Sequence, residues 1–212
     1  MIKAVLFDMD GTLIDTERYF RVFWPKAMAE FGFTMSDEQA LQMRSLGRPF
    51  APAKLKEWFG ETVDYPTIRA RRTKMMEAEF AKDGLQLKAG AEEILEELQR
   101  RGIPAYVVTA SPIERTERYL TQVGIRKYFP RIISATEVKQ GKPAPDVYEY
   151  ACREIGLEPS ECAAVEDSPN GVLSAYRAGC KVIMVPDQSD AEEMREYLYA
   201  VAPTLKEIGE LL

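Results

Sequence analysis

Five short apolar runs recur along the chain, and the segments between them carry the periodicity of helices. The runs are residues 4–7, 105–108, 132–133, 163–165 and 182–185. Short apolar runs that alternate with amphipathic helices are typical of parallel strands joined by crossover helices. The pattern predicts an α/β fold with an open, Rossmann-like parallel sheet. In such a sheet, ligands bind outside the carboxyl ends of the strands.

The helices that connect these strands can be read from their apolar stripes. Between Gly90 and Gly102, Ile94, Leu95 and Leu98 form one stripe and charged residues fill the opposite face, which predicts a helix that ends at a glycine. Residues 146–155 and 169–178 are predicted as further helices, each entered through a proline.

Residues 16–82 interrupt the alternation, because they contain helical patterns without a convincing strand. Apolar residues from Tyr19 to Phe31 follow 3.6-residue spacing, and Pro25 must kink this helix or begin a new turn. Further helices are expected at residues 36–44, 51–59 and 66–82. We therefore expect a core domain of residues 1–15 and 83–212 and an inserted helical cap domain of residues 16–82.

Composition excludes several classes of function. The chain has 212 residues and a net charge of -6, which provides no general attraction for nucleic acid. Residue 2 already begins a strand pattern without a leader, and no apolar run approaches the roughly 20 residues of a membrane span. We expect a cytoplasmic protein that binds neither nucleic acid nor membrane, with a monomer as the default.

The side chains available for catalysis are restricted by the absence of histidine. This absence excludes Ser-His-Asp hydrolysis and zinc sites built on histidine. The three cysteines have neither close pairing nor metal-ligand spacing, so we interpret them as buried thiols. Acid and base chemistry near neutral pH must therefore come from carboxylates, lysine or water.

The first apolar run ends in two carboxylates, Asp8 and Asp10, followed by Gly11. Residues at i and i+2 of a strand point the same way, and glycine allows the chain to turn immediately afterwards. Both carboxylates are expected to face one small site.

Three later segments carry groups that such a site would need. Thr109 ends a second apolar run, Lys142 precedes a proline, and Glu166 and Asp167 end a third run. Each has a simpler interpretation: Thr109 as a helix cap, Lys142 as an exposed loop residue, and the two acids as caps of the following helix. Their occurrence together favours one site that binds a cation and a phosphate.

In this order, the four segments resemble the haloacid dehalogenase-like (HAD) phosphohydrolase superfamily, in particular its β-phosphoglucomutase-like subgroup with a helical cap. The resemblance covers nearly the whole chain. It implies that a small phosphorylated metabolite, such as a sugar phosphate or nucleotide, is hydrolysed with Mg²⁺ as cofactor.

The resemblance implies that Asp8 attacks phosphorus and forms an aspartyl phosphate, while Asp10 protonates the leaving oxygen and then deprotonates water. Mg²⁺ would be held by Asp8, the backbone carbonyl of Asp10 and Asp167, with Glu166 acting through water or behind these ligands. Thr109 and the backbone N–H of Ala110 would bind the phosphoryl group, with Ser111 as a further candidate. Lys142 would stabilise the attacking carboxylate and the transferred charge, so we expect its replacement to damage chemistry more than folding.

Two basic segments of the cap carry different expectations. Gly47 and Arg48 resemble cap positions over the substrate, so Arg48 is a candidate for specificity. Arg69, Arg71, Arg72 and Lys74 are interpreted as a solvated helical face and are not assigned to the site.

Two other functions remain open. A phosphosugar mutase of the β-phosphoglucomutase type shares the core motifs, but that group has a histidine shortly after Asp15 where this chain has Phe20. A noncatalytic protein that binds phosphorylated metabolites is the alternative from a different class. The absent imidazole favours hydrolysis over the mutase.

Overall fold

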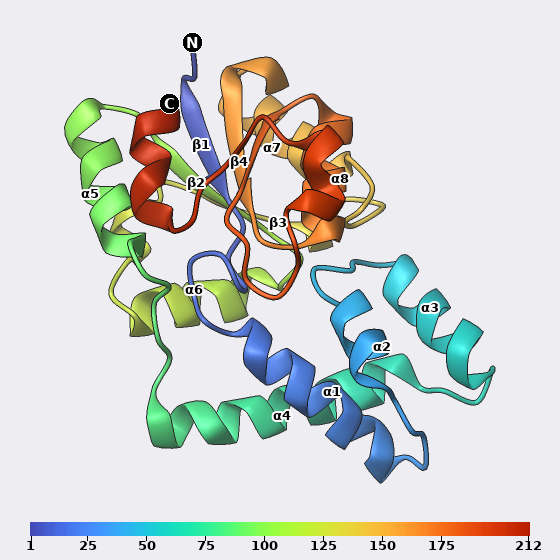
Figure 1. Ribbon diagram of the computed structural model, residues 1–212. Helices are drawn as coiled ribbons and strands as arrows, with labels where there is room; N and C mark the ends of the chain where they lie inside the picture. The colour runs from blue at the N-terminus through green and yellow to red at the C-terminus, as the bar shows by residue number, and fades with distance from the viewer.

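The computed structural model describes residues 1–212 and contains one parallel sheet of six strands in the order β3-β2-β1-β4-β5-β6. In chain order, the strands are β1 (Ala4–Phe7), β2 (Ala105–Thr109), β3 (Ile132–Ser134), β4 (Cys162–Glu166), β5 (Lys181–Met184) and β6 (Ala200–Val201). The chain crosses from one half of the sheet to the other between β3 and β4, so the carboxyl ends of β1, β2 and β4 lie together. Figure 1 shows this arrangement. The predicted α/β fold is confirmed.

Both faces of the sheet are covered, because strand residues point alternately to two apolar clusters. Val5 and Phe7 pack in one cluster with α5 (Ala91–Arg101) and the C-terminal turn η5 (Leu205–Leu211). Ala4 and Leu6 pack in the other. That second cluster includes α7 (Asp146–Ile155) and α8 (Pro169–Ala178). Burial on both faces explains why the strands read as continuous apolar runs.

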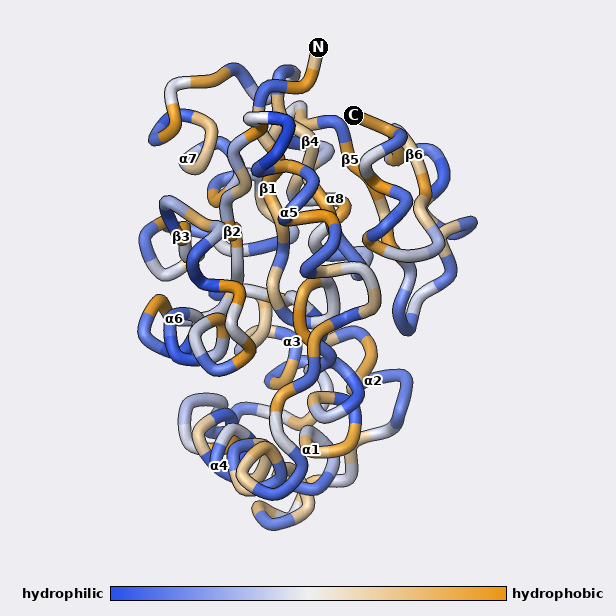
Figure 2. The backbone as a smooth tube through the Cα atoms, turned by 90° about the vertical axis from the view of Figure 1, so that its left-hand side faces the viewer, coloured by the Kyte–Doolittle hydropathy of each residue, from blue (hydrophilic) through white to orange (hydrophobic).

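The remaining helix of the sheet region, α6 (Ile113–Gln122), follows β2. The short turns η1 (Arg126–Tyr128), η2 (Ala135–Glu137), η3 (Pro159–Glu161) and η4 (Glu192–Tyr197) complete the connections. Figure 2 shows hydrophobic and hydrophilic residues alternating along the outer helices, as expected for helices that bury one face.

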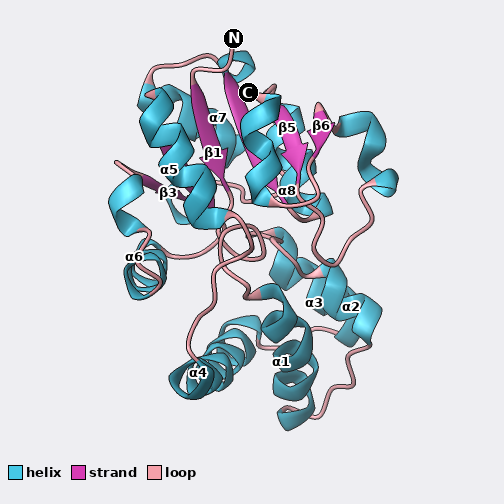
Figure 3. Ribbon diagram, turned by 60° about the vertical axis from the view of Figure 1, so that its left-hand side comes forward, coloured by secondary structure: helices cyan, strands magenta, loops and turns pink.

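Four helices between β1 and α5 lie together beyond the carboxyl ends of the strands (Figure 3). They are α1 (Glu17–Glu30), α2 (Asp37–Gln42), α3 (Phe50–Phe59) and α4 (Tyr65–Asp83). We call them the cap helices. Pro25 lies inside α1, and Ser36 caps α2 by accepting a hydrogen bond from the backbone N–H of Gln39. The predicted domain boundaries at residues 15 and 83 stay a prediction.

The two chain segments that join the cap helices to the sheet run side by side. The backbone N–H of Asp15 donates to the carbonyl of Gln86 at 2.9 Å, and that of Lys88 donates to the carbonyl of Leu13 at the same distance. The chain therefore enters and leaves the cap helices through two adjacent, hydrogen-bonded segments, next to the loop that carries Asp8 and Asp10.

Candidate active site

Asp8 is the first residue beyond β1 and is almost completely buried, with 1% of its surface exposed. Its backbone N–H donates to the carbonyl of Val165 on β4 at 3.0 Å. This bond fixes Asp8 between β1 and β4. The side chain therefore lies where the ends of the central strands meet.

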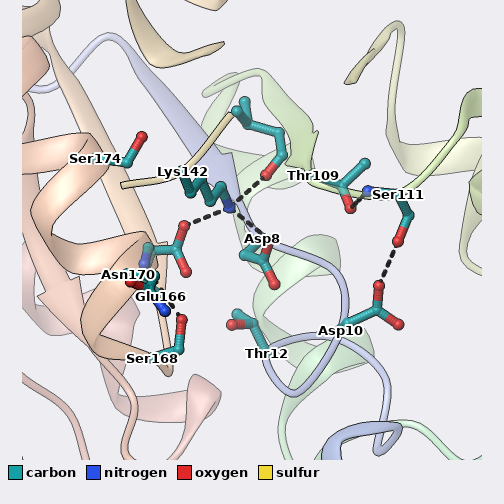
Figure 4. Close-up of polar contacts among 12 residues, drawn as sticks. Asp8, Asp10, Thr12, Thr109, Ser111, Lys142, Glu166, Ser168, Asn170 and Ser174 are labelled. Atoms are coloured by element: carbon teal, nitrogen blue, oxygen red, sulfur yellow. Dashed lines mark hydrogen bonds and ion pairs between the residues drawn. The ribbon is translucent and has the colours of Figure 1, made fainter. Parts of the chain in front are cut away.

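Lys142 supplies the positive charge beside Asp8. Its Nζ lies 2.6 Å from Asp8 Oδ1 and 2.6 Å from Glu166 Oε1, and it donates to the carbonyl of Val108 at 3.0 Å (Figure 4). Tyr148 donates to the same oxygen of Glu166 at 2.5 Å. Burial alone would lower the pKa of Lys142, but the carboxylates of Asp8 and Glu166 raise it above its ordinary value. Lys142 is thus a buried, permanently charged group, and the interpretation as an exposed loop lysine is wrong.

Three buried carboxylates gather at the strand ends. One oxygen from each of Asp8, Glu166 and Asp167 lies within 4.8 Å of the others. Burial, outweighing the attraction of Lys142, raises the pKa of Asp8 well above its usual value. Burial and the charge of Glu166 raise the pKa of Asp167 to about 7. Both residues keep one buried oxygen, Oδ2, without a hydrogen-bond partner.

These carboxylates fit a divalent cation. Lys142 supplies one positive charge against three crowded acids, so further positive charge would reduce their repulsion, and an all-oxygen donor set suits Mg²⁺. The interpretation of the acidic pair as helix caps does not hold, because Ser168 caps α8 by accepting from the backbone N–H of Gly171 at 3.3 Å.

Asp10 lies on the turn after Asp8 and is held by three donors. Its Oδ2 accepts from the hydroxyl of Ser111 at 2.7 Å and from Arg115 at 2.5 Å, and its Oδ1 accepts from Thr16 at 2.8 Å. Figure 4 shows Asp10 facing Ser111 and not the acid cluster. The structure therefore separates the two carboxylates of the first motif: Asp8 belongs to the acid cluster, and Asp10 belongs to a group with Ser111 and Arg115.

The phosphate-binding candidates lie at the end of β2. Thr109 is fully buried, and its hydroxyl accepts from the backbone N–H of Ser111 at 3.0 Å. Thr109, Ala110 and Ser111 line the same cavity as Asp8 and Asp10. Helix α6 begins at Ile113, so Thr109 is not its N-cap residue.

The cap helices close the other side of this cavity, which has a volume of about 810 Å³. Arg48 lines it while remaining exposed to solvent. The neighbouring Gly47 donates its backbone N–H to the carbonyl of Lys142 at 2.8 Å, and Gly141 donates to the carbonyl of Arg48 at 2.6 Å. The cap thus contacts the backbone of the loop that carries Lys142.

Charged residues that the sequence motifs did not indicate also line this cavity, among them Glu17, Arg44 and Arg115. Glu17 is buried, and burial together with Asp167 raises its pKa well above the usual value. Arg44 lies 3.8 Å from Asp167, and Arg115 pairs with Asp10. Glu17 directly follows the first motif, but Arg44 and Arg115 approach the site from segments with no motif of their own.

Residues 2–179 match the haloacid dehalogenase-like hydrolase family. The chain belongs to this family. It is therefore an enzyme of a hydrolase family, as the resemblance implied. No helix has the length and apolar character needed to cross a membrane.

Named relatives match this chain over about nine-tenths of its length. It is 33% identical to validoxylamine A 7'-phosphate phosphatase of Streptomyces hygroscopicus subsp. limoneus over 92% of this chain and 91% of that protein. It is 32% identical to hexitol phosphatase A of Escherichia coli over 92% and 88%. Its structure resembles that of a CbbY mutant from Rhodobacter sphaeroides in complex with xylulose-(1,5)bisphosphate, with a TM-score of 0.83 and 26% identity over 99% and 97% of the two chains.

Proposed function

We propose that this chain is a Mg²⁺-dependent phosphatase that hydrolyses a small phosphorylated metabolite through an aspartyl phosphate on Asp8. The observation that carries the proposal is the contact of Asp8 with Lys142 at 2.6 Å inside a cluster of buried acids. The names of the relatives, which include validoxylamine A 7'-phosphate phosphatase and hexitol phosphatase A, support the same class of reaction.

A carboxylate that attacks a phosphate dianion must overcome like charge. At about 4 Å and an effective dielectric constant near 20, one negative charge against two costs roughly 8 kcal/mol. Lys142 offsets part of this repulsion from a fixed position, without having to move when the substrate arrives. Asp8, Asp167 and the backbone carbonyl of Asp10 would hold Mg²⁺, with Glu166 behind them, and the ion would neutralise the remaining phosphoryl charge.

The other residues that line the cavity have roles that follow from their positions in it. Thr109 and the backbone N–H of Ala110 hydrogen-bond the phosphoryl oxygens at the end of β2. Asp10 transfers the proton to the leaving oxygen and later removes one from water. To do so, Asp10 must exchange its contact with Arg115 for one with the substrate, because Arg115 now pairs with its Oδ2. Arg48, exposed on the cavity wall, contacts the part of the substrate that leaves.

The test is phosphate release from a panel of p-nitrophenyl phosphate, hexose phosphates and hexitol phosphates, in Mg²⁺ and in EDTA. We expect release that depends on Mg²⁺ and is lost in Asp8→Asn. Undiminished turnover in that variant would defeat the mechanism, and binding without release across the whole panel would favour the noncatalytic alternative. Isomerisation of a hexose phosphate that requires a bisphosphate primer would identify a mutase.

A further inference from the structure

Arg72 on α4 is a buried cation without an acidic partner. Only 4% of its surface is exposed, which makes its interpretation as part of a solvated face wrong. Its guanidinium carbon lies 4.5 Å from the ring centre of Phe20 and 4.4 Å from that of Trp24. Its one side-chain hydrogen bond is a long contact of 3.4 Å to Thr73, and its Nε is buried with no partner.

This arrangement leaves a positive charge uncompensated. Two aromatic faces attract a guanidinium, but they do not satisfy its N–H donors. Burial and the neighbouring Arg115 lower the pKa of Arg72 to about 9, so the group still carries its charge at neutral pH. A buried, unpaired charge is costly to maintain, so an anionic group placed against Arg72 would be stabilised there.

The position of Arg72 relates it to the proposed chemistry. It lines the same cavity as Asp8 and Asp10. The ring of Phe20 also contacts Arg115, whose guanidinium carbon lies 5.4 Å from the ring centre and which pairs with Asp10. Phe20 therefore contacts both Arg72 and the arginine that pairs with Asp10 at one end of the cavity. Phe20 is the residue that stands near the family's histidine position, and in this chain its ring contacts two guanidinium groups.

Two other arginines of the cavity already have acidic partners, unlike Arg72. Arg44 and Arg115 already face the carboxylates of Asp167 and Asp10. Arg69 lies one helical turn before Arg72 on α4, is half-buried, and lines the cavity as well. The cap side of the cavity thus offers unpaired positive charge in addition to the phosphate-binding groups at the strand ends.

We propose that Arg72 binds a second anionic group of the substrate, so that the enzyme acts on a small phosphomonoester that also carries a carboxylate or a second phosphate. The inference rests on the proposed phosphatase function and narrows its substrate class. A guanidinium presents parallel N–H donors that match two oxygens of either group.

The experiment compares substrates that differ in one group. Glycerol 3-phosphate and 3-phosphoglycerate differ by a carboxylate, and fructose 6-phosphate and fructose 1,6-bisphosphate differ by a phosphate. We expect kcat/KM to favour the doubly anionic member of at least one pair by about tenfold or more, as one charge-assisted contact allows. The pair that shows the preference distinguishes carboxylate from phosphate.

Arg72→Gln should reduce this ratio to about one. Arg71→Gln is the matched control: Arg71 neighbours Arg72 on α4 but pairs with Glu30 and lies outside the cavity lining, so its loss should leave both the ratio and the activity unchanged. Because Arg72 lacks an acidic partner, Arg72→Gln breaks no ion pair and should not lower the Tm of the free protein by more than about 2 °C. A larger loss of Tm with an unchanged ratio would show a structural role and overturn the proposal.

A binding measurement makes the result independent of turnover. In the Asp8→Asn background, calorimetric titration should show that the doubly anionic ligand binds more tightly than its partner, and that Arg72→Gln abolishes the difference. Equal binding of both ligands would refute the inference even if the wild type releases phosphate. Absence of phosphate release from every substrate, with the binding difference intact, would refute the phosphatase and not the anion site.

Discussion

At the scale of single residues, the site depends on buried charges of opposite sign that neutralise one another. Lys142 is fully buried between Asp8 and Glu166, so it neutralises two acids that water cannot reach. The expectation that replacing Lys142 damages chemistry more than folding stays a prediction, and these contacts add that folding should suffer as well. Sequence alone could not show this, because the lysine and its two partners come from three distant segments.

Lys142→Met should lower both kcat and stability. It leaves two buried carboxylates without a counter-charge, which typically costs about 3 to 5 kcal/mol in free energy of unfolding. Urea unfolding near pH 8 measures this loss, which should shrink below pH 6 as the orphaned acids take up protons. In the control Lys88→Met, the broken pair with Asp187 is partly exposed, so the loss should be about 1 kcal/mol or less. Equal losses in both variants would contradict the account.

At the scale of elements, a glycine contact joins the cap helices to the sheet. A Cβ at Gly47 would lie 2.6 Å from Gly141 Cα and 3.0 Å from the backbone nitrogen of Lys142. These atoms are backbone and cannot swing aside. Only two glycines allow the loop before α3 to approach the loop of Lys142 this closely, and the resulting backbone bonds form one wall of the cavity.

Gly47→Ala should therefore push the two loops apart. We expect kcat/KM to fall about tenfold, because misplacement by about 1 Å near a reacting centre can cost that much or more. Gly60→Ala is the control, since Gly60 ends α3 at a φ of +85° with no atom within 4 Å of an added Cβ. That variant should lose stability through backbone strain while keeping its activity. A Gly47→Ala enzyme with wild-type kcat/KM would show that the contact is dispensable.

The elements themselves were largely predictable, because most have strong patterns. Helices α7 and α8 have the predicted bounds, and α4 differs by one residue at each end. Strand β6 was missed, because it is two residues long and only half-buried, so it has neither length nor apolar periodicity. Arg72 was misread because the spacing of charges along a helix does not reveal which of them a neighbouring helix covers.

At the scale of the whole molecule, the absence of histidine makes the pH dependence of stability informative. Burial raises the pKa of Asp167 to about 7, so this residue is expected to titrate between pH 6 and 8, and burial also raises the pKa values of Asp8 and Glu17 well above their usual range. Such a group binds its proton more tightly in the folded state than in the unfolded state. Its contribution to stability therefore falls as pH rises from its ordinary pKa towards its folded value.

In EDTA, the Tm should accordingly be higher at pH 6 than at pH 8, by about 2 °C or more. Saturating Mg²⁺ should remove or reverse this difference, because a metal ion binds the ionised carboxylates. Asp167→Asn should weaken the dependence in EDTA. Scanning calorimetry at the two pH values, with and without Mg²⁺, measures all three effects. A Tm in EDTA that rises from pH 6 to pH 8 would show that these acids are not crowded as described.

The claim that a covalent phosphate forms on Asp8 can be tested by trapping it. The enzyme is mixed with a substrate that it hydrolyses, quenched in acid within milliseconds and reduced with borohydride, which converts an aspartyl phosphate to homoserine. Peptide mass spectrometry should then find homoserine at position 8 in the wild type and none in Asp8→Asn. Rapid turnover with an unmodified residue 8, or with the modification at another acid, would contradict the account.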